Sequence, residues 1–187
     1  MSWYTLVVDE PLLFYAFKRS NTMTIRLAIQ KDLSALTSIY NEAILRQTCT
    51  ADTEVFTVEK RQAFLDAHQN DLYPLYVYEV DNKAVGYVYF SAYRPGRKAM
   101  IKTAEISYYI ANDYQGQGIG STLLAFALEE AKRLGFKTLV AILLGVNKPS
   151  IGLLEKFGFE KWGCLPSIAE FDYGMSDHLY YGLKLED

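Results

Sequence analysis

A glycine-rich stretch between a strand pattern and a helix pattern constrains this chain most. It reads Tyr114-Gln115-Gly116-Gln117-Gly118-Ile119-Gly120-Ser121, between the alternating apolar run 104–111 and the amphipathic run 122–134. Glycine allows backbone conformations and close approaches that a side chain forbids. The following helix presents unpaired N–H groups and the positive end of its dipole. The stretch therefore predicts a strand-to-helix turn able to cradle phosphate, although such turns also serve packing alone.

The remaining patterns predict a mixed α/β fold with a mostly antiparallel sheet flanked by helices. Short turns at 81–83 and 94–97 make the three strands before the glycine stretch an antiparallel meander. This meander argues against a Rossmann domain, and no Lys-Ser/Thr pair follows the glycines as a P-loop requires. The predicted strands are 24–29, 75–80, 84–93, 102–111, 138–144, 159–164 and 179–185, and the predicted helices are 32–45, 57–68, 122–134 and 147–157. Asp32 and Thr57 are the expected N-caps of the first two helices.

Composition excludes several function classes. The net charge of −3 gives no attraction to nucleic acid or to an anionic membrane. Two cysteines and two histidines provide neither a disulfide framework nor a metal centre, so no metal is expected. No apolar run approaches the ~18 residues of a membrane span, and residues 3–17 carry acidic residues and no basic start, unlike a signal peptide. We expect a cytoplasmic protein with one domain over residues 23–187, preceded by an extension, residues 1–22, of unknown role.

Two motifs in sequence order resemble signatures of the GNAT N-acetyltransferases. Gln115-x-x-Gly118-x-Gly120 is similar to their acyl-CoA pyrophosphate loop, and the run from Asn147 through Ser150 to Gly158-Phe159 is similar to their second signature. The resemblance covers the chain from about Met23 to the C-terminus. Within that superfamily, the strand 103–110 and the approach to it at 97–100 resemble the phosphinothricin N-acetyltransferase group.

The resemblance implies acetyl-CoA as the acyl donor and a small-molecule amine as the acceptor. Backbone N–H groups of the glycine stretch would hold the pyrophosphate, the splayed end of the preceding strand would pair with the pantetheine arm, and polar side chains of the next helix would bond that arm. For Asn147, the alternative is a plain helix cap. The implied cofactor-binding residues are Tyr108, Tyr109, Ile110, Gln115, Gly116, Gln117, Gly118, Ile119, Gly120, Ser121, Asn147 and Ser150.

Glu105 is the candidate catalytic residue. It stands between Ala104 and Ile106 in an otherwise apolar strand, where a carboxylate is costly unless it is paired or functional. The resemblance makes it a general base whose pKa is raised by partial burial. The structural alternative is a solvent-facing carboxylate or an ion pair with Arg97 or Lys98; Arg97 is also the candidate substrate-binding residue.

Two departures from the family pattern affect the mechanism and the acceptor. Leu154 stands where many members carry an acid that protonates the thiolate, which leaves Tyr173 or Tyr180 as candidates, or water. The loop 47–52 is small and polar, where aromatic and basic residues usually hold an amino-acid substrate. The acceptor is expected to be an amino acid or an analogue such as phosphinothricin or methionine sulfoximine, with a peptide or protein N-terminus as the rival.

Two further expectations concern catalysis and assembly. A non-catalytic acyl-CoA-binding module, a sensor or interaction domain, is the alternative to an enzyme. The apolar meander and the Tyr-rich run 179–181 predict surface that a second copy covers, hence a homodimer.

Overall fold

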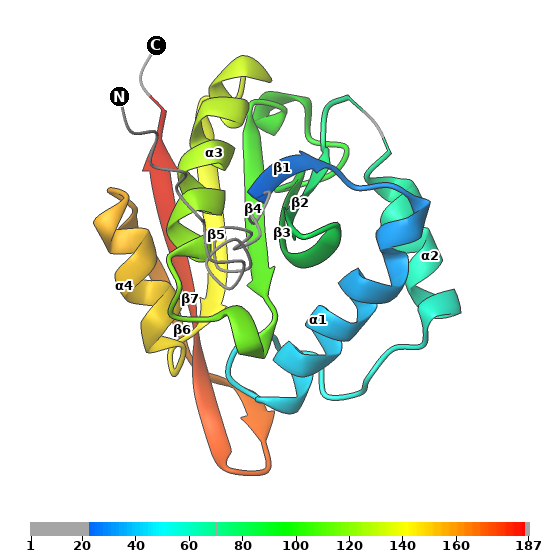
Figure 1. The fold of residues 1–187 in the computed structure, drawn as a ribbon. Coiled ribbons are helices and arrows are strands. Elements are labelled where there is room, and N and C mark those ends of the chain that lie inside the picture. The colour runs from blue at the N-terminus through cyan, green and yellow to red at the C-terminus, as the bar shows by residue number, and fades with distance from the viewer. Residues whose placement is uncertain (1–22, 70, 186–187) are drawn as a thin grey trace, which may run out of the picture.

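A computed structural model of the protein describes residues 23–69 and 71–185 (Figure 1). The predicted extension, residues 1–22, lies outside them. The predicted order of helices and strands is confirmed. The strands are β1 (Met23–Leu27), β2 (Leu75–Val80), β3 (Lys83–Ala92), β4 (Thr103–Ile110), β5 (Thr138–Leu144), β6 (Glu160–Phe171) and β7 (Gly174–Lys184), and the helices are α1 (Leu33–Leu45), α2 (Val58–Ala67), α3 (Ile119–Arg133) and α4 (Lys148–Lys156).

The seven strands form one sheet in the order β1-β2-β3-β4-β5-β7-β6. All neighbours are antiparallel except β4 and β5, which are parallel. Only Thr103, Ala104 and Glu105 of β4 pair with β5, opposite Thr138–Val140. Beyond Glu105 the two strands diverge, while β4 continues to pair with β3 as far as Ile110. The predicted splay of this strand end is therefore present.

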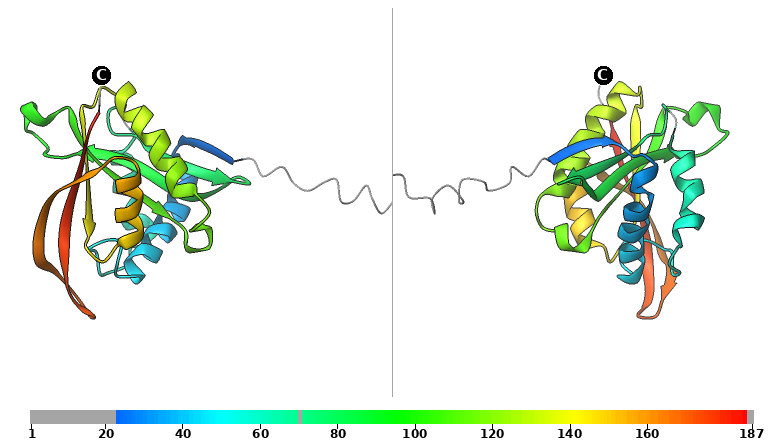
Figure 2. Two further views of the ribbon diagram at one scale, coloured as in Figure 1. Left: turned by 90° about the vertical axis from the view of Figure 1, so that its left-hand side faces the viewer. Right: turned by 45° about the vertical axis from the view of Figure 1, so that its right-hand side comes forward.

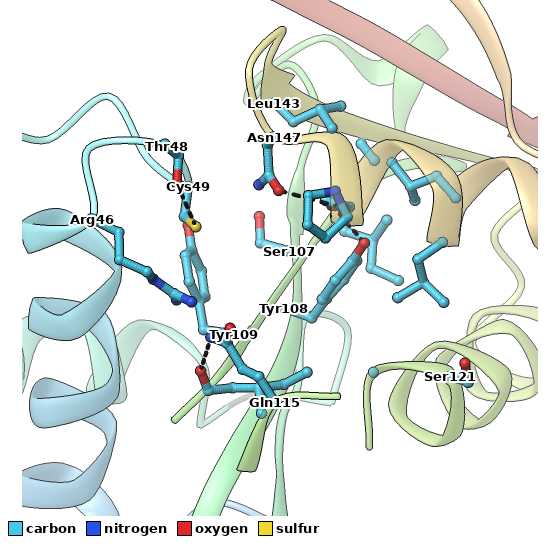
Figure 3. Close-up of a pocket in the computed structure, with 18 of the residues that line it drawn as sticks. Arg46, Thr48, Cys49, Ser107, Tyr108, Tyr109, Gln115, Ser121, Leu143 and Asn147 are labelled. Carbon is cyan, nitrogen blue, oxygen red and sulfur yellow. Dashed lines mark hydrogen bonds between the residues drawn. The ribbon is translucent and has the colours of Figure 1, made fainter. Parts of the chain in front are cut away.

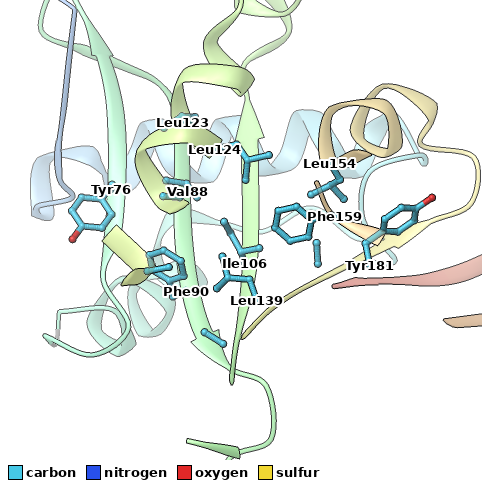
Figure 4. Packing of buried hydrophobic residues seen from close by; sticks show 14 of the residues in the cluster. Tyr76, Val88, Phe90, Ile106, Leu123, Leu124, Leu139, Leu154, Phe159 and Tyr181 are labelled. Atoms are coloured by element: carbon cyan, nitrogen blue, oxygen red, sulfur yellow. The ribbon is translucent and has the colours of Figure 1, made fainter. Parts of the chain in front are cut away.

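Two apolar layers hold helices against the two faces of the sheet. On one face α1 and α2 cover Leu75, Val77 and Tyr87. On the other face α3 and α4 cover a larger core that includes Phe90, Ile106 and Leu139 (Figure 4). Because strand side chains alternate between faces, the same alternation that predicts the strands assigns each residue to its layer. The strand β4 contributes to both layers and lies at the centre of the molecule.

The start of α1 is built differently from a simple cap. Asp32 stands at the predicted N-cap, but its side chain makes no capping bond into the helix. Its carboxylate instead accepts from the Ile29 backbone N–H (2.9 Å) and from two nitrogens of Arg26 (2.7 and 2.9 Å). Arg26 also donates to Glu79 through Nε (3.0 Å). A buried arginine–carboxylate cluster therefore joins β1, β2 and the start of α1.

The helix α2 is fastened by a cap and by a buried cation. The Thr57 side chain accepts from the Lys60 N–H, as predicted for an N-cap. The guanidinium of Arg61 lies 4.3 Å from the ring centre of Tyr40 on α1 and 3.9 Å from that of Phe64. Such cation–π contacts gain strength where water is excluded. They hold α2 against α1, the helix that leads to the functional site.

The last hairpin is longer than the sequence predicted. β6 continues well past residue 164, and β7 begins well before residue 179. Together they form a long ribbon that projects from the body (Figure 2). Register shifts interrupt their pairing near residues 161–163 and 165–169. At its tip, the Tyr173 hydroxyl donates to the Gln47 carbonyl (3.0 Å), and Gln47 Nε2 donates to Asp172 (2.9 Å). The tip is thereby tied to the loop that follows α1.

Candidate active site

A pocket of about 670 Å³ opens where β4 and β5 diverge (Figure 3). Its walls come from the end of β4, the middle of β5, the glycine stretch, the start of α4 and the loop after α1. Because β4 has no partner on its β5 side beyond Glu105, its backbone there is free to pair with an extended ligand. The lining includes ten of the twelve predicted cofactor-binding residues: Tyr108, Tyr109, Ile110, Gln115, Gly116, Gly118, Gly120, Ser121, Asn147 and Ser150.

The three glycines of the stretch serve two different purposes. Gly116 and Gly118 have positive φ values of 71° and 83°, and a Cβ built on either meets no atom within 4 Å. At Gly120 a Cβ would lie 3.1 Å from Leu153 and 3.2 Å from Ile110, so this glycine lets α3 pack against α4 and β4. Gly118 is the N-cap of the 15-residue helix α3, whose first N–H groups have no partner in the helix. The open glycines and the helix start form a cradle of the kind that holds a diphosphate.

The start of α4 forms the opposite wall. Asn147 Oδ1 accepts from the Ser150 N–H (3.3 Å), so the helix-cap interpretation of Asn147 is confirmed, and Asn147 lines the pocket as well. The Ser150 and Tyr108 hydroxyls lie 2.7 Å apart, across the gap between α4 and β4. Burial raises the pKa of Tyr108 to about 12, against a lowering by Ser150. Tyr108 therefore presents a protonated phenol at neutral pH.

Glu105 lies at the closed end of the gap, as the last β4 residue paired with β5. Along the strand it shares a face with Ser107 and Tyr109, which line the pocket. Burial raises the pKa of Glu105 above its ordinary value, and its charge adds to the burial that raises the pKa of Tyr89. No ion pair joins Glu105 to Arg97, Lys98 or any other described residue. The ion-pair alternative for Glu105 is therefore wrong in this structure, and its partial burial matches the expectation for a base.

Besides Glu105, whose neighbours Ile106 and Ser107 line the pocket, three predicted site residues are not in the pocket wall. Arg97 lies on the exposed loop between β3 and β4. Gln117 is exposed, and its side chain donates to the Asp113 carbonyl (2.8 Å). Ile119 is buried in the main core under the first turn of α3. Arg97 as a substrate ligand stays a prediction, but the structure does not bring it to the pocket.

The pocket residues at the end of α1 and in the loop behind it belong to none of the motifs recognised in the sequence. These are Arg46, Thr48 and Cys49. Arg46 reaches toward Tyr109, on the opposite side of β4 from Ser121 (Figure 3). The small, polar loop seemed to lack a basic residue only because Arg46 stands one position before it, at the C-cap of α1. A cation there is common for helix-dipole reasons and so gives a weak sequence signal.

The structure also bears on which side chain could protonate the CoA thiolate, since Leu154 stands at the position of the usual acid. Leu154 is buried in the core and can donate no proton. Neither Tyr173 nor Tyr180 lines the pocket, and the Tyr173 hydroxyl bonds the Gln47 carbonyl instead. Tyr108 is the tyrosine whose protonated hydroxyl is bonded within the pocket wall, and it replaces these two as the candidate acid.

Over residues 23–69 and 71–185, no helix is long and apolar enough to span a membrane. Within the same residues, no group of three or more His, Cys, Asp or Glu side chains could hold a metal ion.

Comparison with known proteins agrees with this geometry. Residues 36–159 match the model of the acetyltransferase (GNAT) family. A Bacillus subtilis (strain 168) protein, YwnH, named as a candidate phosphinothricin acetyltransferase, is 46% identical over 87% of this chain and 99% of its own length. An L-methionine sulfoximine/L-methionine sulfone acetyltransferase of Salmonella typhimurium is 33% identical, over 78% of this chain and 85% of its own.

One of the similar solved structures is described as containing acetyl-CoA. A Salmonella typhimurium protein, described as a candidate acetyltransferase with its cofactor acetyl-CoA, superimposes with a TM-score of 0.83 at 31% identity, covering 89% of this chain and 95% of that one. The strand order, the glycine cradle and these matches agree, so the non-catalytic alternative is not needed. The chain belongs to the GNAT acetyltransferase family and is an acetyl-CoA-dependent N-acetyltransferase of the phosphinothricin acetyltransferase type.

Proposed function

We propose that the protein transfers the acetyl group of acetyl-CoA to the primary amine of an amino acid or an amino-acid analogue, such as phosphinothricin or methionine sulfoximine. The observation that carries this proposal is the pocket at the β4–β5 divergence. It has the glycine cradle and the α4 start on one side, and the end of α1 on the other. Donor and acceptor can meet there and react directly. The acceptors named for the relatives are small amino acids of this kind.

In this proposal, separate residues around the gap between β4 and β5 bind the donor and accept the proton of the acceptor. The diphosphate occupies the cradle of Gly116 and Gly118, and the pantetheine amides pair with the free side of β4 at Tyr108–Ile110. Glu105 takes the proton of the acceptor ammonium, directly or through water, because an amine must be neutral to attack. The amine nitrogen then bonds to the thioester carbonyl carbon, and backbone N–H groups of β4 stabilise the resulting oxyanion.

The second half of the reaction breaks the carbon–sulfur bond. The electron pair leaves on sulfur, and the nitrogen loses its second proton as the amide forms. The CoA thiolate takes a proton from the Tyr108 hydroxyl or from water. The second nitrogen proton replaces the one given to the thiolate, and Glu105 releases the first proton to solvent. The products are an N-acetyl amino acid, the CoA thiol and one proton, so atoms and charge balance without any further reactant.

Replacing Glu105 with Gln tests the base directly. The change keeps shape and hydrogen bonding but removes proton affinity, so kcat should fall by about 10²–10⁴ while acetyl-CoA affinity is unchanged. Thiol release would be followed with phosphinothricin, methionine sulfoximine and a short peptide bearing a free N-terminus. Glu160→Gln, at an exposed carboxylate on β6, is the matched control.

The pH dependence gives a second readout. Because burial raises the pKa of Glu105, the wild-type rate should rise with pH through an ionisation above the ordinary carboxyl range. The Glu105→Gln rate should lack that ionisation and keep only that of the amine. A folded Glu105→Gln enzyme with near-normal turnover at neutral pH would refute the base assignment. Acetylation of the peptide alone would refute the proposed acceptor class.

We also propose that the protein works as a homodimer. The surface expected at 179–181 is not exposed, because Leu179 and Tyr181 are buried in the core. The long β6–β7 ribbon instead exposes large apolar side chains, with Trp162, Leu165, Ile168 and Met175 between 43% and 56% exposed. Exposed apolar area of this kind commonly marks a protein interface. Sedimentation at micromolar concentration should give the mass of two chains, and a monomer there would contradict the proposal.

A further inference from the structure

The candidate base does not itself line the pocket. The wall includes Ser107 and Tyr109 of β4, whereas Glu105 is half-buried at the closed end of the β4–β5 gap. Burial is the only influence that shifts the pKa of Glu105, so no described neighbour holds its carboxylate by a hydrogen bond or an opposite charge. An amine that binds in the pocket therefore needs a group between itself and Glu105 that passes its proton on.

Ser107 occupies that position. Ser107 and Glu105 stand two residues apart in an extended strand, so their side chains leave the same face of β4 about 7 Å apart along it. On the neighbouring strand β3, Tyr89 pairs with Ser107 and Ser91 pairs with Glu105. Of these four residues only Ser107 lines the pocket, where its side chain is seen in Figure 3. Its hydroxyl is thus the polar side-chain group of this face that a ligand in the pocket reaches first.

Tyr89 closes the β3 side of the same face. Its ring is held edge-on by the rings of Phe64 and His68 at the end of α2, with ring centres 5.1 and 4.9 Å away. Burial raises the pKa of Tyr89, the Ser107 hydroxyl lowers it, and the charge of Glu105 raises it further. The Tyr89 hydroxyl therefore lies close to both side chains and limits the positions that the Ser107 hydroxyl can take.

We infer that the Ser107 hydroxyl carries the proton of the acceptor amine from the pocket to Glu105. This inference rests on the proposed function and adds a catalytic residue to it, with Tyr89 as a positioning residue. As the N–H bond of the ammonium breaks, its proton bonds to Ser107 Oγ, and the proton that Ser107 carried passes to the Glu105 carboxylate. Serine is restored in the same step without becoming an alkoxide, so the proton count of the reaction is unchanged.

Thiol release with phosphinothricin and methionine sulfoximine tests this transfer in single variants. Ser107→Ala should lower kcat by ~10–100-fold, a part of the usual effect of general-base catalysis. Ser107→Thr keeps a hydroxyl at the same place and should stay within about fivefold of the wild type. Ser91→Ala is the matched control, since it removes a hydroxyl beside Glu105 on the same face but outside the pocket wall, and kcat should stay within about twofold. Calorimetry should give an unchanged acetyl-CoA affinity for all three variants.

A double variant separates proton transfer from a structural role. If Ser107 acts through Glu105, Glu105→Gln with Ser107→Ala should be at most about twofold slower than Glu105→Gln alone, because residues that act as a unit are not additive. Multiplied losses would overturn the inference. So would near-normal kcat in Ser107→Ala, an equal loss in Ser91→Ala, a loss that Ser107→Thr does not restore, or weaker acetyl-CoA binding in Ser107→Ala. Failure of the proposed function appears separately, as absence of thiol release by the wild type with every amine, and would remove the inference with it.

Discussion

The arginine–carboxylate cluster at the start of α1 gives a stability prediction that the geometry makes quantitative. Arg26→Ala would leave Asp32 and Glu79 facing each other without their shared cation, and their side chains are only 4% and 12% exposed. Breaking a buried pair by removing one partner costs about 3–5 kcal/mol. Arg26 is itself 26% exposed, so solvent screening reduces the expected loss to about 2–3 kcal/mol. For a domain of this size, that loss lowers Tm by about 5–10 °C.

Urea unfolding at pH 7, followed by circular dichroism, would measure this loss, with Lys31→Ala as the matched control. Lys31 contacts the same Glu79 carboxylate at 3.7 Å but is 56% exposed, so its removal should cost at most ~0.5 kcal/mol. A loss below about 1 kcal/mol for Arg26→Ala, or an equal loss for both variants, would refute the reasoning.

The same cluster fixes the sign of a pH effect. Burial alone would raise the pKa of Asp32, but the bonds from Arg26 and from the Ile29 N–H outweigh it and lower the pKa. A carboxyl whose folded-state pKa lies below its unfolded value stabilises the protein above the unfolded pKa, and this contribution is lost as pH falls through the folded pKa. In Arg26→Ala the bonds from Arg26 are gone and burial remains. The stability difference between the two proteins should therefore be largest at neutral pH and shrink in acid.

Two predictions concern the binding of acetyl-CoA in the pocket. Acetyl-CoA should protect Cys49 in the pocket wall from iodoacetamide but leave the exposed Cys164 reactive, as peptide mass mapping would show; equal protection of both thiols, or of neither, would contradict the pocket assignment. Gly118→Val should abolish acetyl-CoA binding in a folded protein. The control is Gly135→Val, beyond the other end of α3, where φ is 80° and the space is equally open, so it should lower stability by a similar amount and keep binding. Unchanged affinity in Gly118→Val would refute the role of the glycine cradle.

The sequence predicted the fold well where local patterns and tertiary packing agree. The predicted range of β5 is identical to the observed one, and the meander, the Thr57 cap and the glycine turn are as expected, because alternation and capping are local signals. The β6–β7 ribbon was predicted too short. β6 contains Pro166 and Ser167, which are typical of turns, and an irregularity in pairing between Leu165 and Ala169 accommodates them.

The candidate site was predictable on the donor side and much less so on the acceptor side. The donor residues lie in two contiguous motifs, so their spacing carries information about the ligand. Arg46 belongs to no motif, and only the three-dimensional structure shows that the end of α1 brings it into the pocket wall. Arg97, the sequence-based candidate for substrate binding, is exposed and does not line the pocket, although it lies close in sequence to β4.

Because β4 and β5 pair at only three residues, the sheet consists of two parts, here called leaves, that are joined by this short pairing. One leaf, β1 to β4, carries α1 and Arg46, and the other, β5 to β7, carries α4 with Asn147 and Ser150. The leaves meet again where Gln47 bonds Asp172 and Tyr173 at the ribbon tip. The pocket therefore lies between the β4–β5 pairing and the hydrogen bonds at the ribbon tip. The angle between the two leaves sets the distance between its two walls. A substitution of Gln47, Asp172 or Tyr173, which lie outside both motifs, would change the affinity for both substrates together.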